Sequence, residues 1–332
     1  MYKAFFLPTL ISILILIGVF IWGGLHAFVL TTLLVILEVT LSFDNAVVNA
    51  KILAKMSEKW QKRFLTWGIL VAVFGTRFVL PIIIVSVSVL VSPWVVAKLA
   101  FFDPEAYGHL LEGAHHAIAA FGGSFLLMVS LKYFFDDSKD VHWIKVIEKK
   151  LSAWGRIEAI EIGISLIILL TLALLVPGET ATILVSGLVG IVLFIAMQGI
   201  ANAFASEQAT MVGAGSAALF VYLNVLDAAF SLDGVVGAFA ITNELAIIII
   251  GLSIGAYFVR SMTVYLVQKK TLETLTYLEQ GAHWAILGLA IAMLVSLFRE
   301  VPEVITGLVG IVFVGSAYWA SIRAQKAASL NA

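Results

Sequence analysis

The chain has 332 residues, of which 61% are hydrophobic and only 12% are charged, and its mean hydropathy is +1.07. This composition excludes an ordinary soluble protein and indicates a polytopic membrane protein. A net charge of −1 excludes an electrostatic nucleic-acid binder. The lack of cysteine excludes disulfide frameworks, thiolate nucleophiles and cysteine-ligated metal centres. The remaining chemistry depends on oxygen ligands, histidines and buried charges.

We predict an all-α fold in a single transmembrane domain that comprises residues 1–332. A membrane span needs roughly 20 mainly apolar residues, and about ten such segments recur along the chain. They are residues 5–22, 27–50, 64–91, 115–135, 158–176, 181–199, 213–241, 244–268, 281–298 and 304–322. The third is long enough to be tilted or broken near Pro81, and residues 200–211 are too polar to span and indicate a loop or an interfacial stretch.

Loop charges predict the orientation of these spans. Lysine and arginine are concentrated in the loops 51–63 and 132–156, and cytoplasmic loops carry such an excess. With both loops inside the cell, alternation of the spans places both termini in the cytoplasm. The location expected for the protein is therefore the inner (plasma) membrane, with an acidic outer loop that contains Asp103, Glu105 and Glu112.

The second basic loop also has a helical pattern. Its apolar residues recur at helical spacing on an otherwise charged stretch: Val141, Ile144, Ile147, Leu151 and Trp154. This pattern predicts an amphipathic surface helix within residues 136–157.

The chain contains an internal repeat. Residues 38–45 read Glu-Val-Thr-Leu-Ser-Phe-Asp-Asn, and residues 227–234 read Asp-Ala-Ala-Phe-Ser-Leu-Asp-Gly. Both stretches contain an acid, a serine four residues later and an aspartate two residues after that. In the next predicted span of each copy, a glycine precedes an arginine by nine residues. These pairs are Gly68 with Arg77 and Gly251 with Arg260.

A third match follows one span later, where Gly-Ala-His ends at His115 in one copy and at His283 in the other. The repeats therefore cover about residues 27–135 and 213–298. Because an odd number of crossings separates them, they have opposite orientations in the membrane. Inverted repeats are typical of secondary transporters, whose substrate sites lie near the midplane where the repeats meet.

The charges inside the predicted spans are repeated as well. A carboxylate at the bilayer centre costs roughly 2.5–3.5 kcal/mol, so several acids and two arginines there indicate a function. The polar residues of each copy share one helix face: Glu38, Ser42, Asn45 and Asn49 in the first, Asn224, Asp227 and Ser231 in the second. Asp44 and Asp233 point away from these faces on a straight helix. Either each helix is broken near its serine, or the aspartates face another partner such as the arginine of their own repeat.

At an interface between the repeats, these groups would form an all-oxygen site. Glu38, Asp44, Asp227 and Asp233 would supply carboxylates, and Ser42, Ser231 and Asn45 would supply neutral oxygens. Hard divalent cations prefer such ligands, whereas zinc and copper favour nitrogen and sulfur. The alternative is structural: Glu38 and Asp227 could simply pair with Arg77 and Arg260 and hold the helices together.

The histidines offer several roles. His115 and His283 occupy matching positions near the ends of their spans, so they could be metal ligands, proton relays or packing residues. Packing or interhelical hydrogen bonding is the interpretation we favour.

The paired motifs, each followed by the glycine–arginine span, resemble the TerC family of integral membrane proteins within the LysE-like transporter superfamily. The resemblance covers roughly residues 27–298 and is closest to a subgroup known as an uncharacterised domain. Members of the family are associated with manganese export, and some with membrane-protein maturation. The resemblance implies that Glu38, Asp44, Asn45, Asp227 and Asp233 are the counterparts of the metal-site residues. One departure is that Gly234 stands where the first copy has Asn45, so the half-sites are chemically unequal.

The function that we expect is export of a divalent metal cation, Mn²⁺ first, in exchange for protons. The partners expected are therefore a divalent cation, protons and membrane lipid, without nucleic acid or a cofactor. Self-association into a homo-oligomer is compatible with the sequence. One rival is an exporter of a small organic solute such as an amino acid, and another is a non-transporting scaffold for secretion or metal stress. An enzyme is not expected, because no catalytic constellation or cofactor motif occurs.

Overall fold

The computed structural model describes residues 2–206, 212–242, 244–269, 271–299 and 301–330. Within some helices, the side chains of certain residues lie outside this description, and Asp233 is one of them. Every regular element of the described residues is helical, which confirms the all-α prediction. Within the described ranges, seven helices are long and apolar enough to cross a membrane.

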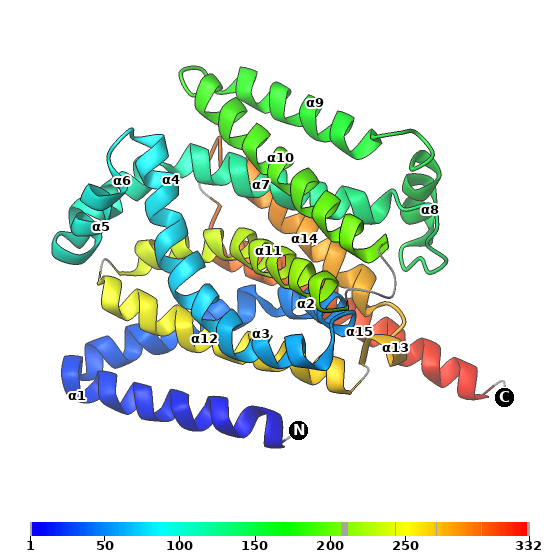
Figure 1. The fold of residues 1–332 in the computed structure, drawn as a ribbon, viewed down its shortest axis with the longest axis horizontal. Helices are drawn as coiled ribbons and strands as arrows, with labels where there is room; N and C mark the ends of the chain where they lie inside the picture. The colour runs from blue at the N-terminus through cyan, green and yellow to red at the C-terminus, as the bar shows by residue number, and fades with distance from the viewer. Residues whose placement is uncertain (1, 207–211, 243, 270, 300, 331–332) are drawn as a thin grey trace.

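The first two predicted spans form one interrupted element. The helix α1 (Tyr2–Leu41) has non-helical backbone angles at Gly24, with φ 68° and ψ −163°. Figure 1 shows the two halves of α1 as an antiparallel hairpin whose turn lies at the left of the view. The helix α2 (Phe43–Ala54) follows after an irregularity at Ser42. The hydrogen bonds from Ser42 N to Glu38 O (3.0 Å) and from Ala46 N to Ser42 O (3.3 Å) remain, so the predicted break is only local.

The third predicted span is divided into α3 (Glu58–Leu70), the π-helical segment η1 (Val71–Val79) and α4 (Leu80–Ser88). Pro81 stands at the start of α4, where a proline needs no helical hydrogen bond. The irregularity therefore lies in η1 before Pro81, and this segment carries Arg77.

The acidic loop with Asp103, Glu105 and Glu112 contains two short helices, α5 (Pro93–Phe102) and α6 (Pro104–Gly113). Between them Asp103 caps α6, because its Oδ1 accepts a hydrogen bond from Ala106 N at 3.1 Å. The central helix of the bundle is α7 (His115–Phe134). In its apolar window 83% of the residues are buried, whereas the proportion is 17% in the peripheral α1.

The amphipathic segment forms α8 (Lys145–Trp154), which confirms a helix there. The face that packs on the bundle is different from the expected apolar face. Glu148 and Ser152 are buried, whereas Ile147 and Trp154 are exposed. Glu148 accepts hydrogen bonds from the backbone N–H groups of residues 143 and 144 and from Trp284 Nε1. These bonds satisfy the buried carboxylate and attach α8 to the bundle.

The remaining helices are α9 (Ile160–Leu175), α10 (Thr180–Ser206), α11 (Val212–Ile241), α12 (Leu245–Gln268), α13 (Thr271–Thr274), α14 (Leu278–Val295) and α15 (Glu303–Leu330). Residues 200–206, predicted as a loop or an interfacial stretch, are helical, since α10 continues to Ser206; residues 207–211 lie outside the described residues. Each predicted span contains a helix, although α9 has only 16 residues.

The long helices run between two ends of the bundle (Figure 1). The start of α1 and the end of α15 lie at the same end, together with α8 and α13. Between these ends, α1 and α2 pack on α12, whereas α11 packs on η1 and α3. The helices α7 and α14 pack on each other. The polar residues of α1, α2 and α11 thus meet the two arginine-bearing elements inside the bundle.

Candidate functional site

The first buried ion pair joins Glu38 of α1 to Arg77 of η1. Arg77 Nη2 contacts Glu38 Oε1, and both side chains are almost completely buried. Ser42 Oγ donates to the same carboxylate oxygen at 3.2 Å. Arg77 Nη1 donates to Ala72 O at 2.9 Å and to Thr76 Oγ1 at 3.4 Å. Glu38 is therefore paired with the arginine of its own repeat.

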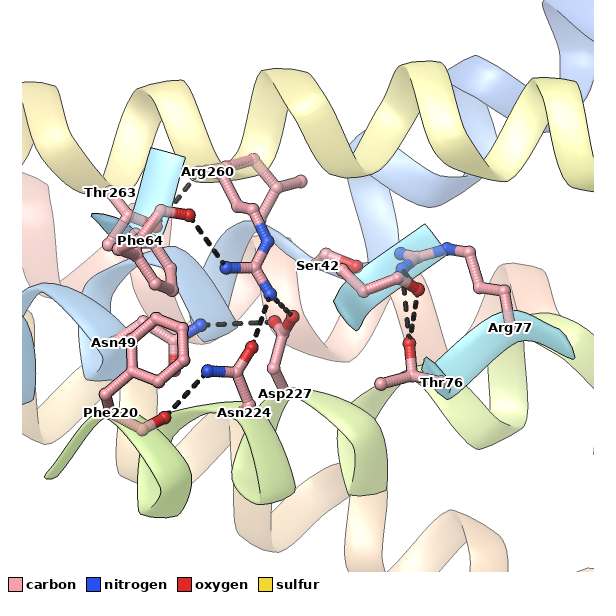
Figure 2. A network of polar contacts seen from close by, with 12 residues as sticks. Ser42, Asn49, Phe64, Thr76, Arg77, Phe220, Asn224, Asp227, Arg260 and Thr263 are labelled. Carbon is pink, nitrogen blue, oxygen red and sulfur yellow. Dashed lines mark hydrogen bonds and ion pairs between the residues drawn. The ribbon is translucent and has the colours of Figure 1, made fainter. Parts of the chain in front are cut away.

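The second ion pair joins Asp227 of α11 to Arg260 of α12. Arg260 Nη2 lies 2.6 Å from Asp227 Oδ2 and 3.4 Å from Asn224 Oδ1. The other carboxylate oxygen, Asp227 Oδ1, accepts a hydrogen bond from Asn49 Nδ2 of α2 at 3.2 Å. Figure 2 shows this cluster beside the Arg77 cluster. The second pair thus repeats the first and adds a direct bond to the other copy.

Arg260 also contacts the first repeat. Its Nη1 donates to Phe64 O at 3.4 Å, and its guanidinium lies over the Phe64 ring at 4.2 Å. A Cβ at Gly68 would come within 2.5 Å of Arg260 Nη1. The sequence had related Gly68 to Arg77 by spacing alone. In the structure, Gly68 instead provides space for the arginine of the opposite repeat.

Two glycines of the second repeat provide space for Glu38. A Cβ at Gly255 would lie 2.5 Å from Glu38 Cβ and Cγ, and one at Gly234 would lie 3.3 Å from Glu38 Oε2. The absence of a side chain at residue 234, where the first copy has Asn45, therefore has a steric reason.

A small cavity of about 10 Å³ separates the ion pairs. That volume accommodates about one water molecule. Its lining consists of Glu38, Ser42, Asn45, Arg77, Asp227, Ser231, Ala256, Val259 and Arg260. Asn45 Oδ1 and Ser231 Oγ are buried there without a hydrogen-bond partner. Buried polar atoms are normally satisfied, so these two oxygens, which have no partner among the described residues, leave hydrogen-bonding capacity free in the cavity.

Asp44, the second acid of the first motif, does not line this cavity. Asp44 is buried, accepts a hydrogen bond from Asn45 N at 3.0 Å, and lies 3.9 Å from the position of a Cβ at Gly310 of α15. Asp233 lies in α11, but its side chain is outside the described residues. Among the side chains that the structure describes, no group of three or more His, Cys, Asp or Glu could hold a metal ion. The convergence of all four acids stays a prediction.

The two asparagines of the predicted polar faces belong to the Asp227 cluster. Asn49 donates to Asp227, while its Oδ1 is buried without a partner. Asn224 Nδ2 donates to Phe220 O at 2.7 Å, so that its oxygen faces Arg260. Sequence reasoning missed Phe64 and Thr76, which hold the arginines through a backbone carbonyl and a hydroxyl that no motif indicates.

Comparison with known families adds one relationship. Residues 43–328 match the model of a family described as a protein of unknown function, DUF475. The chain belongs to the DUF475 family. No curated protein and no solved structure matches it. The match begins directly after Ser42, so it includes Asp44, Asp227 and both arginines but not Glu38.

The two histidines at matching positions of the repeats in this DUF475 chain connect α7 with α14. His115 Nε2, at the start of α7, lies 3.1 Å from Ser296 O just beyond α14. His283, at the start of α14, stacks on Tyr133 near the end of α7, with ring centroids 3.5 Å apart. Both contacts are interhelical, as packing residues would make, and neither histidine lines the small cavity.

A larger cavity of about 390 Å³ lies where α2, α7 and α9 meet. Its charged lining residues are Lys51, Lys55, Lys132, Asp136, Asp137 and Glu161. Lys132 Nζ lies 2.8 Å from Glu161 Oε1, and Lys51 pairs with Glu279 of α14. Nearby, Lys139 Nζ lies over the Tyr133 ring at 4.0 Å, and burial lowers the pKa of Lys139. The C-terminal part of α2, the helix that carries Asn45 and Asn49, forms part of the lining of this larger cavity.

Proposed function

We propose that this protein is a secondary transporter that exports a divalent metal cation, with Mn²⁺ the first candidate, in exchange for protons. The observation that carries the proposal is the small cavity in which Glu38 and Asp227 face the unpartnered oxygens of Asn45 and Ser231. All of the donor atoms are oxygens, which suits a hard divalent cation. The proposed site also includes Ser42, with Asp44 and Asp233 as the flanking acids.

Helix packing supports the inverted repeat within this proposal. The first copy places α1 and α2 on α12, and the second places α11 on η1 and α3. Likewise α14 packs on α2, and α7 packs on α11. Such exchanged pairs are expected of repeats related by a two-fold axis. The site would then lie at the repeat interface, as it does in many secondary transporters.

The membrane arrangement and the coupling belong to the same proposal. About ten spans, cytoplasmic termini and an inner-membrane location follow from the segment count and the loop charges. The resemblance to the TerC family supports manganese as the substrate. Protons are the proposed counter-ions, and the flanking acids Asp44 and Asp233 are the carboxyl groups proposed to take them up when the metal leaves.

Transport by the purified protein tests this function. Proteoliposomes containing a trapped pH indicator and a metal indicator are exposed to Mn²⁺, Mg²⁺ or Ca²⁺. We expect Mn²⁺ uptake with alkalinisation of the lumen, and loss of uptake in the Asp44→Asn/Asp233→Asn variant and in Asp227→Asn. Glu112→Gln, which changes an exposed acid outside the site, is the control. Absence of cation movement, or full activity in both neutralised variants, would contradict the proposal.

The larger cavity favours a second candidate, export of a zwitterionic organic solute such as an amino acid. Its volume of about 390 Å³ and its charges of both signs suit such a molecule. The same proteoliposomes distinguish the two candidates. An amino-acid exporter would move a labelled amino acid without added metal. In that case Asp227→Asn would leave the metal content of the vesicles unchanged.

A further inference from the structure

We propose that Arg77 and Arg260 serve as built-in counter-cations, which occupy Glu38 and Asp227 when no substrate is bound and which the transported cation displaces. This inference rests on the proposed function, because it describes how the proposed metal site is neutralised when it is empty and how the metal enters it. It gives both arginines a role beyond holding the helices together.

The charge balance of the cavity is the first argument. Among the described side chains, the ionisable groups that line it are two acids and two arginines, whose formal charges sum to zero. Each carboxylate contacts a guanidinium directly. An isolated carboxylate at this depth would be costly, whereas a paired one is tolerated. The empty site is therefore neutralised by its own side chains, and an incoming cation must compete with them.

Space is the second argument. The cavity holds about one water, whereas a divalent cation needs about six oxygen ligands around it. The oxygens are present: two on each carboxylate, and one each on Ser42, Asn45 and Ser231. Room for the cation appears only when the guanidinium groups withdraw. Asn45 Oδ1 and Ser231 Oγ, which have no partner in the empty site, would then gain one.

Each arginine also has contacts that remain without the acid. Arg77 Nη1 is bonded to Ala72 O and Thr76 Oγ1 within its own helical segment. Arg260 Nη1 is bonded to Phe64 O, and its guanidinium lies over the Phe64 ring. In both arginines Nε has no partner, so the guanidinium is incompletely held. A guanidinium displaced from its carboxylate can therefore rotate while these other contacts still hold it.

Binding measurements on the full-length protein in detergent test the inference, with Mn²⁺ as the probe. In Arg77→Gln and Arg260→Gln we expect Mn²⁺ to bind at least roughly tenfold more tightly, since an adjacent opposite charge changes a carboxylate's affinity for a cation by that factor or more. Transport should become slower, because nothing displaces the bound metal. Arg→Lys variants should retain affinities near that of the wild type. Arg299→Gln, at an exposed arginine, is the matched charge control.

A glycine variant makes the same test without changing any charge. In Gly68→Ala the new methyl group would lie within 2.5 Å of Arg260 Nη1, so the guanidinium that contacts Asp227 has to shift from its position. We expect tighter Mn²⁺ binding there as well, whereas Gly75→Ala, whose Cβ would meet only a neighbour on its own helix at 3.4 Å, should have no effect.

The outcomes separate the inference from the function. Weaker or unchanged Mn²⁺ binding in the glutamine variants that fold, or in Gly68→Ala, would overturn the displacement of arginine while leaving transport in place. Failure of the wild type and of every variant to bind any divalent cation would instead refute the proposed function.

Discussion

At the scale of single residues, the two half-sites are unequal in a compensating way. The longer acid, Glu38, lies against Gly234, whereas the counterpart of Gly234 in the first copy, Asn45, lines the cavity that both acids share. A Cβ at residue 234 would already lie 3.3 Å from Glu38 Oε2, so an asparagine there would require the Glu38 carboxylate to shift. Acid length and the size of the facing residue therefore have to change together.

A variant pair tests this relation. Gly234→Asn should displace Glu38 from Arg77 and destabilise the protein by about 3 kcal/mol, the cost of breaking a buried ion pair. Combining it with Glu38→Asp, which copies the pairing of the other half-site, should recover much of that loss. Denaturant unfolding in detergent measures the coupling. Strict additivity of the two single changes would show that the residues are independent.

At the scale of helices, the hairpin in α1 depends on one backbone conformation. Gly24 has φ and ψ angles that are essentially restricted to glycine. Nothing lies within 4 Å of a Cβ built there, so any cost of a side chain would come from the backbone alone. The turn separates the first span from the one that carries Glu38.

We expect Gly24→Ala to lower stability by about 1–3 kcal/mol through backbone strain. Gly18→Ala is the matched control in the same helix, since its Cβ also meets nothing and its backbone is helical. It should be neutral or stabilising by up to about 1 kcal/mol. The apparent unfolding temperatures of the two variants are compared in detergent. Equal temperatures would show that an alanine at residue 24 does not strain the backbone.

The sequence predicted the positions of the helices better than the irregularities within them. Hydropathy located a helix in each predicted span, because apolar length is the dominant requirement in a bilayer. It did not locate the π-helical segment that carries Arg77, since local hydrogen bonding there depends on tertiary contacts. The motif predicted the Glu38–Arg77 and Asp227–Arg260 pairs only as an alternative. The contact of Arg260 with Phe64 of the other repeat could not be predicted, because it depends on how the two repeats pack together.

At the scale of the whole molecule, the common end of α1 and α15 has a testable consequence (Figure 1). The chain has no cysteine, so single cysteines can be introduced without background labelling. Lys59 lies near the start of α3, within the basic stretch 51–63 that was predicted to be cytoplasmic. His109 lies in α6, near the opposite end of the bundle. Each is replaced by cysteine in turn.

In intact cells, a membrane-impermeant maleimide should label His109→Cys only, and permeabilisation should expose Lys59→Cys to it. Lysines attract acidic lipid and resist translocation, which is the physical reason for the expected orientation. The reverse labelling pattern would show that the protein is inserted with its termini outside.

The close approach of Gly234 to Glu38 also constrains how such a molecule can be assembled. Two separate copies of the first half would place an asparagine against each glutamate, and the carboxylates would have no room. Two copies of the second half would leave each short aspartate facing a glycine and an unfilled gap. The halves are complementary rather than interchangeable, so a split version of the protein should function only as a heterodimer of one half with the other.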